Sequence, residues 1–258
     1  MKIVLENLTK VFPSRTKGGN DVVAVNDMCI EIPDGELVGL LGPSGCGKST
    51  TLFMLSGLEA PTGGKIYFGD QDVTDLSPEK RGIGLVFQNY ALYPHMTVEQ
   101  NIMFPLLNMR MPKEEAKARA LEAAGLVQIQ ELMQRKPKEL SGGQQQRVAI
   151  ARTLAMNPEI ILFDEPMSAL DVDTRLSLRS ELKRIQKMYG NTMIYITHDQ
   201  EEAFAMSDKI MVMNEGVIHQ LDTPENIVKN PSDDFVKTFV LDNLQLKLDS
   251  LIKYVKEK

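Results

Sequence analysis

Residues 42–50 read GPSGCGKST, and their glycines and lysine are spaced for binding phosphate. They match the pattern G-x-x-x-x-G-K-[ST], in which backbone amides surround phosphate oxygens, the lysine neutralises them and the last hydroxyl binds Mg²⁺. The apolar run ELVGLL precedes the segment and the helical pattern STTLFMLSGL follows it, which is the strand, loop and helix order that the motif requires. The predicted phosphate-contacting residues are Gly42, Pro43, Ser44, Gly45, Cys46, Gly47, Lys48, Ser49 and Thr50.

Two acidic residues end a second apolar run, EIILFDEP. Continuous apolar runs are typical of buried parallel strands, so we expect Asp164 and Glu165 at the carboxyl end of one. Asp164 is predicted to hold Mg²⁺ through water, because this ion keeps several of its waters. Glu165 is the predicted residue that orients or deprotonates an attacking water. The alternative is two ordinary acids at a strand end, which the phosphate loop in the same chain disfavours.

Two further apolar runs, GIGLVFQN and TMIYITHD, place Gln88 and His198 at similar strand ends. Ligands of open parallel sheets bind beyond the carboxyl ends of the strands, so all these side chains are expected around one γ-phosphate. Gln88 is predicted to orient water and, with Ser49 and Asp164, to bind the metal. His198 is predicted to contact the phosphate. A lone glutamine or histidine is more often structural, so the prediction rests on the combination.

A serine and two glycines precede a predicted helix in LSGGQQQRVAIAR, residues 140–152. Ser141 and Gln144 fit a capping box, which would make this segment an ordinary helix start. That interpretation leaves Gly142 and Gly143 unexplained. Two glycines cost backbone entropy and indicate a close approach to the backbone, and a helix N-terminus suits an anion. A helix cap and a phosphate contact therefore both remain open.

The elements that would position these residues predict an α/β fold. Residues 1–88 and 154–225, approximately, should form the nucleotide-binding core, with an antiparallel sheet that includes GGKIYFGDQDV. Residues of about 89–153 should form an inserted helical subdomain, because PKEEAKARALEAAGL is rich in strong helix formers.

Residues 231–258 should form a short C-terminal helical tail. We expect this helix to pack back on the rest of the chain, with a partner-binding helix as the alternative. Its apolar residues at helical spacing are Leu244, Leu248, Leu251, Ile252 and Val255.

Composition bounds the class of protein. A chain of 258 residues with 43% apolar residues can bury a sizeable core, and its net charge of −6 disfavours nucleic acid or anionic lipid as a direct partner. Its two cysteines, Cys29 and Cys46, form no disulfide framework and suit a reducing cytosol. The start MKIVLENLTK does not resemble a signal peptide, and no run approaches the about 20 apolar residues of a membrane span. We expect a globular protein without direct lipid insertion.

In order and spacing, these segments resemble the nucleotide-binding subunits of ATP-binding cassette (ABC) transporters over about residues 1–230. The resemblance covers the Walker A loop, the glutamine loop at Gln88, the signature 140–144, the Walker B acids, the D-loop 168–171 and the switch histidine His198. It implies a P-loop NTPase (RecA-like) core with an N-terminal antiparallel β-subdomain and an inserted α-helical subdomain. The implied cofactors are ATP and Mg²⁺.

The resemblance also implies a head-to-tail dimer, with a second copy or a paralogous cassette. In it, one subunit's helix start would close over the nucleotide of the other. The implied nucleotide contacts of this kind are Ser141, Gly142, Gly143, Gln144 and the D-loop residue Asp171. Phe12 is the implied aromatic that stacks on adenine, although the loop PSRTKGGN after it blurs the register. Cys46 is usual in such loops and implies no redox role.

Within the family, RGIGLVFQNYALYPHMTVEQNI and DEPMSALD are similar to type I importer subunits for sugars, polyamines, iron and oxyanions. This implies an ATPase, cytoplasmic and peripheral on the inner membrane face, that drives permease subunits and depends indirectly on an extracytoplasmic solute-binding protein. Tyr90, Tyr93 and Pro94 would face a coupling helix of the permease, with ordinary packing within the subdomain as the alternative. Many relatives carry a C-terminal β-barrel regulatory domain, and we expect a cassette without it. An exporter ATPase and a soluble regulatory ABC ATPase are the alternatives.

Overall fold

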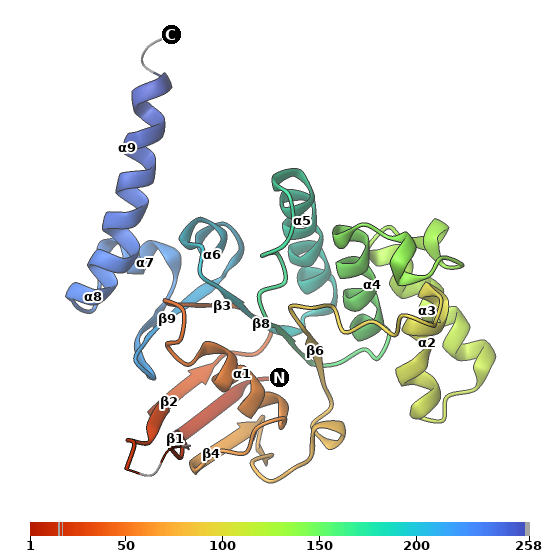
Figure 1. Ribbon diagram of the computed structural model, residues 1–258, viewed down its shortest axis with the longest axis horizontal. Coiled ribbons are helices and arrows are strands. Elements are labelled where there is room, and N and C mark those ends of the chain that lie inside the picture. The colour runs from red at the N-terminus through yellow and green to blue at the C-terminus, as the bar shows by residue number, and fades with distance from the viewer. Residues whose placement is uncertain (15, 17, 256–258) are drawn as a thin grey trace.

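The computed structural model describes residues 1–14, 16 and 18–255, which form two β-sheets with helices around the larger one (Figure 1). The smaller sheet is antiparallel, with the strand order β2-β1-β4-β5. Its strands are β1 Ile3–Phe12, β2 Val22–Ile32, β4 Gly63–Phe68 and β5 Gln71–Asp72. Arg15 and Lys17, in the predicted loop after Phe12, lie outside the described residues.

The larger sheet has the order β10-β9-β3-β8-β7-β6, and β10 alone among these strands runs antiparallel to its neighbour. Its strands are β3 Leu37–Leu41, β6 Ile83–Val86, β7 Ile160–Phe163, β8 Thr192–Thr197, β9 Lys209–Asn214 and β10 Val217–Asp222. Leu41 pairs with Thr197 and Val86 pairs with Phe163, so four parallel strands end at the same edge. The predicted site segments follow these four ends.

The apolar runs of β3, β7 and β8 are buried on both faces of the larger sheet. Along β7, Ile160 and Leu162 pack toward the smaller sheet, while Ile161 and Phe163 pack toward the helices on the other side. A strand covered on both faces needs apolar residues at every position, which explains why these segments do not alternate in polarity.

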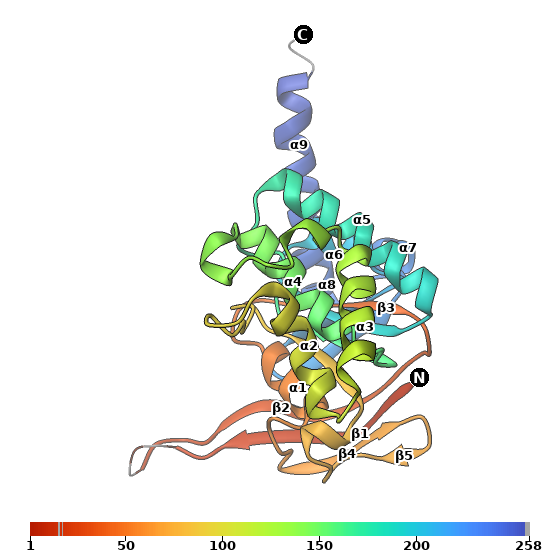
Figure 2. The ribbon, with the colours of Figure 1, turned by 90° about the vertical axis from the view of Figure 1, so that its right-hand side faces the viewer.

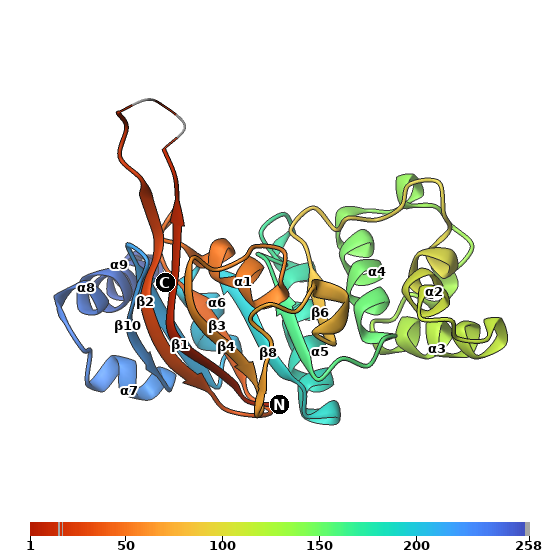
Figure 3. The ribbon, with the colours of Figure 1, turned by 90° about the horizontal axis from the view of Figure 1, so that it is seen from below.

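Nine α-helices occur in the described part of the chain: α1 Lys48–Ser56, α2 Val98–Asn108, α3 Lys113–Leu126, α4 Gly142–Leu154, α5 Val172–Tyr189, α6 Gln200–Met206, α7 Pro224–Lys229, α8 Asp234–Val236 and α9 Asn243–Val255. Helices α2, α3 and α4 pack on one another beside the end of the larger sheet, next to β6 (Figures 1 and 3). The predicted fold class, α/β with an N-terminal antiparallel sheet and inserted helices, is confirmed. Within the described residues, no helix combines the length and apolar character that a membrane crossing needs.

The C-terminal helix α9 follows a π-helical turn, Lys237–Asp242, and extends away from the rest of the molecule (Figures 1 and 2). Leu244 packs at its base, but Leu246 and Leu248 are 68% and 50% exposed. The expectation that this helix packs back on the chain is therefore wrong beyond the base of the helix, where Lys247 still pairs with Asp199. Periodicity shows which residues share a face and not what covers them. The side chains of Leu251 and Val255 lie outside the described part of the structure.

Candidate functional site

The glycine loop lies between β3 and α1, where neighbouring backbone leaves no space for side chains. A Cβ on Gly42 would lie 2.2 Å from the carbonyl oxygen of Met213, and one on Gly47 would lie 2.2 Å from that of Ala24. Gly47 also has a φ of 108°, which L side chains rarely adopt. The loop is thus held against β2 and β9, and it delivers the N-terminus of α1, with its free amides, to the edge of the sheet.

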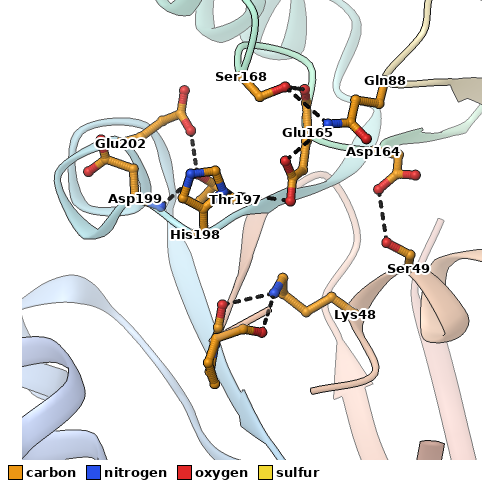
Figure 4. Close-up of polar contacts among 12 residues, drawn as sticks. Lys48, Ser49, Gln88, Asp164, Glu165, Ser168, Thr197, His198, Asp199 and Glu202 are labelled. Carbon is orange, nitrogen blue, oxygen red and sulfur yellow. Dashed lines mark hydrogen bonds and ion pairs between the residues drawn. The ribbon is translucent and has the colours of Figure 1, made fainter. Parts of the chain in front are cut away.

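Lys48 is 6% exposed and lies folded onto its own loop. Its ammonium donates to the carbonyl oxygens of Gly42 and Pro43, both at 2.8 Å (Figure 4). The thiol of Cys46 lies 3.8 Å from the same nitrogen, and burial raises the pKa of that thiol. A raised pKa keeps the thiol protonated, in keeping with a packing role for Cys46 rather than a redox one.

A cavity of about 270 Å³ opens in front of the loop. Its walls come from the loop and α1, from Val22 to Ala24 on β2, and from Glu165 and Gly216. Phe12 pairs with Val22, a wall residue of this cavity, in the ladder between β1 and β2, and it is not itself among the residues that line the cavity. The ammonium of Lys10 lies 5.0 Å from the ring centroid. Adenine stacking on Phe12 stays a prediction.

Ser49 and Asp164 meet across the sheet edge. The hydroxyl of Ser49 lies 3.2 Å from Oδ1 of Asp164, and the backbone amide of Asp164 donates to the carbonyl of Val86 at 2.9 Å. Asp164 is 8% exposed, and this burial raises its pKa. A carboxylate and a hydroxyl are hard oxygen ligands, and a buried carboxylate is stabilised by a cation, so the pair fits Mg²⁺.

Three strand ends bring together Gln88 after β6, Glu165 after β7 and His198 after β8 (Figure 4). The amide of Gln88 donates to Oε2 of Glu165 at 3.4 Å, and Nδ1 of His198 lies 3.6 Å from Oε1 of Glu165. Glu165 has a φ of 45°, an uncommon backbone conformation for a residue other than glycine. Such strained residues gather at active sites, and here the turn directs the carboxylate between the other two side chains.

The signature segment forms the expected capping box. The hydroxyl of Ser141 accepts from the amide of Gln144 at 3.3 Å, and the side-chain oxygen of Gln144 accepts from the amide of Ser141 at 3.0 Å. A Cβ on Gly143 would lie 2.6 Å from the methyl group of Thr174, so packing against α5 requires that glycine. Gly142 has no such neighbour, since its Cβ would lie 3.4 Å from the Tyr90 hydroxyl. Capping explains the serine at position 141 and packing explains the glycine at position 143. No contact among the described residues requires a glycine at position 142.

The signature segment starts helix α4, which Figure 1 places to one side of α1 and the glycine loop. None of its residues lines the cavity in front of the loop. The D-loop residue Asp171 instead caps α5, where its carboxylate accepts from the amide and hydroxyl of Thr174 at 2.9 and 2.8 Å. These hydrogen bonds lower the pKa of Asp171. One chain therefore brings together the residues predicted to bind phosphate and metal, and leaves the signature residues elsewhere.

Sequence reasoning missed Arg152, at the end of α4. Its guanidinium donates to the carbonyls of Ala91 at 2.7 Å and Tyr90 at 3.0 Å, and lies 5.7 Å from the ring of Tyr93. Tyr90 and Ala91 both have positive φ, so the loop after Gln88 is tightly bent where Arg152 holds it. Nothing in the spacing of the sequence indicates this contact, because it joins segments about 60 residues apart.

The chain matches the family model described as ABC transporter over residues 25–168. Among curated proteins it is 48% identical to the sn-glycerol-3-phosphate import ATP-binding protein UgpC 3 of Agrobacterium fabrum, over 93% of this chain and 66% of that protein. It is 48% identical to the spermidine/putrescine import ATP-binding protein PotA of Bacillus thuringiensis, over 93% of this chain and 73% of that protein. With the trehalose/maltose import ATP-binding protein MalK of Thermococcus litoralis it shares 50% identity, over 85% of this chain and 61% of that protein. The chain thus spans 61–66% of the length of two of these three relatives.

Solved structures agree in fold. A dimeric ATP-binding cassette in a post-hydrolysis state, bound to ADP and phosphate, superposes with a TM-score of 0.77 at 36% identity, over 86% of this chain and 98% of that one. The cbiO1 protein of Clostridium perfringens, part of the transporter complex cbiONQ, superposes with a TM-score of 0.80 at 28% identity, over 99% of this chain and 98% of that one.

Proposed function

Because this chain belongs to the ABC transporter family, we propose that it is the ATP-hydrolysing subunit of an importer that depends on a solute-binding protein. The observation that carries the proposal is the meeting of Gln88, Glu165 and His198 beside the Lys48 loop and the Ser49–Asp164 pair (Figure 4). A phosphate site, a metal site and a candidate base at one sheet edge are the parts that phosphoryl transfer to water needs.

In the proposed mechanism the ATP phosphates bind the amides at the start of α1. Lys48 exchanges the carbonyls of Gly42 and Pro43 for phosphate oxygens, a charge-assisted contact that is stronger than the ones it replaces. Mg²⁺, when bound, would neutralise charge on those oxygens, and Ser49 and Asp164 would hold it, with Gln88 as the third predicted ligand. Phe12 would stack on the adenine beside the cavity.

The residues after the three strand ends would carry out the hydrolytic step. The carboxylate of Glu165 takes a proton from the attacking water, whose oxygen bonds to the γ-phosphorus as the bond to ADP breaks. Gln88 orients that water through its amide. His198 holds Glu165 from the opposite side and contacts the γ-phosphate.

The proposed active form is a head-to-tail pair of cassettes, either two copies or this chain with a paralogue. Each site would then be completed by the signature residues Ser141, Gly142, Gly143 and Gln144 and by Asp171 of the other subunit. Gly142 supports this arrangement, since no internal contact requires a glycine there. The start of α4 would present amides and a positive dipole end to the phosphate charge that develops in the reaction.

A groove beside the helical subdomain supports a permease as partner. Tyr93, Phe104, Pro105 and Arg152 line this groove, of about 310 Å³, next to the loop that carries Gln88. A short helix of a membrane subunit could seat its apolar face there, and movement of that helix would reach Gln88 through Tyr90 and Ala91. The chain would thus work as a peripheral subunit on the cytoplasmic membrane face, held by protein contacts.

ATP titration and hydrolysis assays test the enzymatic part of this proposal. The chain should hydrolyse ATP only with Mg²⁺, and Lys48→Ala should weaken ATP binding, because a buried cation at the phosphates is lost. Lys65→Ala is the matched control, since Lys65 pairs with Asp72 on the exposed antiparallel sheet. Unchanged ATP affinity in Lys48→Ala would contradict the phosphate role.

Affinity purification from membranes separates the transport alternatives. Recovery with permease subunits and a solute-binding protein supports the importer. Recovery with membrane subunits alone favours an exporter, and recovery without any membrane protein favours a soluble regulatory ATPase.

A further inference from the structure

A second, smaller cavity lies behind Glu165 and His198. About 50 Å³ of it can be reached by the centre of a water molecule, and its walls include both residues together with Arg175, Thr197 and Glu202. A cavity needs roughly 10–15 Å³ of such space to hold a water, so this one is large enough.

The wall on α6 carries a buried carboxylate. Glu202 is 6% exposed, and its Oε2 accepts a hydrogen bond from the hydroxyl of Thr197 (Figure 4). Its other oxygen, Oε1, is buried and has no hydrogen-bond partner among the described residues. Among the described residues, the carboxylate of Glu202 is therefore held by the hydrogen bond from Thr197.

Another residue that lines the cavity carries an unmatched donor. Arg175, on α5, donates through Nη2 to the carbonyl of Leu170 in the D-loop at 3.0 Å. Its Nε is buried and likewise has no partner among the described residues. Glu202 and Arg175 both line the cavity, and each keeps one buried polar atom without a partner among the described residues.

Glu202 also holds the backbone around His198. The Thr197 hydroxyl that donates to Glu202 accepts from the amide of Asp199 at 3.1 Å. One carboxylate thus fixes, through one hydroxyl, the residues on both sides of His198. The exposed Glu201, next to Glu202 on the same helix, contacts none of these groups through its side chain.

We propose that Glu202 is a positioning residue that fixes His198 through Thr197. The inference rests on the proposed function, because it takes His198 to act on the γ-phosphate. Glu202 and Thr197 would affect the hydrolytic step and not ATP binding, because neither lines the cavity in front of the glycine loop.

Four variants test the hydrogen-bond chain, with Glu201→Ala as the matched control on the same helix. Glu202→Ala should lower kcat by about 10-fold or more, as expected when a reacting group is misplaced, with ATP affinity unchanged. Glu202→Gln should recover most of the loss, because its amide oxygen can accept from Thr197. Thr197→Ser should likewise retain activity, and Thr197→Val should lose it.

Contrary outcomes are equally specific. Full kcat in both Glu202→Ala and Thr197→Val would overturn the positioning role, as would equal loss of kcat in Glu202→Gln and Glu202→Ala. A parallel fall of kcat and ATP affinity would indicate general damage and overturn it too. If Glu202→Ala fails to fold, the nearly isosteric Thr197→Val decides. An inactive wild-type chain would instead refute the proposed ATPase.

Discussion

The hydroxyl of Ser49 lies 3.2 Å from the carboxylate of Asp164, although 115 residues separate them in the sequence. The contact joins the start of α1 to the end of β7, and it brings together two hard oxygen atoms beside the glycine loop. Backbone structure orients both residues. The glycine loop positions Ser49, and the hydrogen bond from the backbone amide of Asp164 to the carbonyl of Val86 positions Asp164.

Asp164→Asn should stabilise the protein without metal or nucleotide, and weaken its use of Mg²⁺. Burial raises the pKa of Asp164, so the folded state binds its proton more tightly than the unfolded state does. The free energy of unfolding therefore falls as pH rises from the ordinary aspartate value of 3.8 through the folded-state pKa. Asp164→Asn has no ionisable group at this position, so its free energy of unfolding should not fall in this way.

Thermal unfolding from pH 4 to 8 in a chelator measures this effect, with the exposed Asp70→Asn as control. The variant should also need more Mg²⁺ for half-maximal ATP hydrolysis. A variant less stable than the wild type at neutral pH would mean that the charge on Asp164 is stabilised by its surroundings.

Glu165→Gln should bind ATP normally and turn it over at least about 10²-fold more slowly, because an amide cannot accept the proton of the attacking water. Single-turnover kinetics measure the hydrolytic step directly. Near-normal turnover would remove Glu165 from the role of base.

Ser141→Arg should prevent an ATP-dependent dimer while leaving ATP binding intact. The large side chain would occupy the place where a second subunit's γ-phosphate must dock. If Ser141 serves only as a helix cap, the change should cost ~1 kcal/mol of stability and nothing else. Thr97→Arg is the matched control, because Thr97 caps α2 with the same capping box. Dimerisation is best measured in Glu165→Gln, with and without ATP.

Mixing Ser141→Arg with Lys48→Ala extends the same prediction. A mixed dimer contains one site built from both unmutated halves, so ATPase activity should rise above the average of the two variants. Simple averaging would count against a shared site, unless the dimerisation assay shows that the sites are formed but strictly coupled.

Arg152→Ala should destabilise the fold by about 1–3 kcal/mol, because it removes a charged donor from the carbonyls of Tyr90 and Ala91. Arg152→Lys should lose less, since one ammonium can reach one of the two carbonyls. Urea unfolding measures both variants. Equal stability of all three proteins would show that the loop after Gln88 does not depend on this contact.

Much of the site could be predicted because its signals are local. The loop 42–50 needs its glycines within a few residues of one another. Apolar runs mark β6, β7 and β8, and Gln88, Asp164 and His198 follow these runs. Once those strands are placed in one parallel sheet, the convergence of their ends follows from topology.

The remainder depends on contacts between distant segments. Three features arise only when separate elements pack against one another. They are the hydrogen bond from Arg152 to the carbonyl of Tyr90, the positive φ of Glu165 and the cavity beside Glu202. The tail helix shows the same limit. An apolar stripe from Leu244 onward predicts an amphipathic helix, but whether the stripe is covered depends on the direction of the turn before it.

The two cysteines differ in environment, so a fluorescent dye can be attached at one of them without mutating the other. Cys29 is exposed on β2, whereas Cys46 is buried in the loop beneath Lys48 with its pKa raised. A maleimide dye should therefore label β2 once per molecule and spare the glycine loop. In a head-to-tail pair, energy transfer between the two dyes would follow the closing of the cassettes in real time.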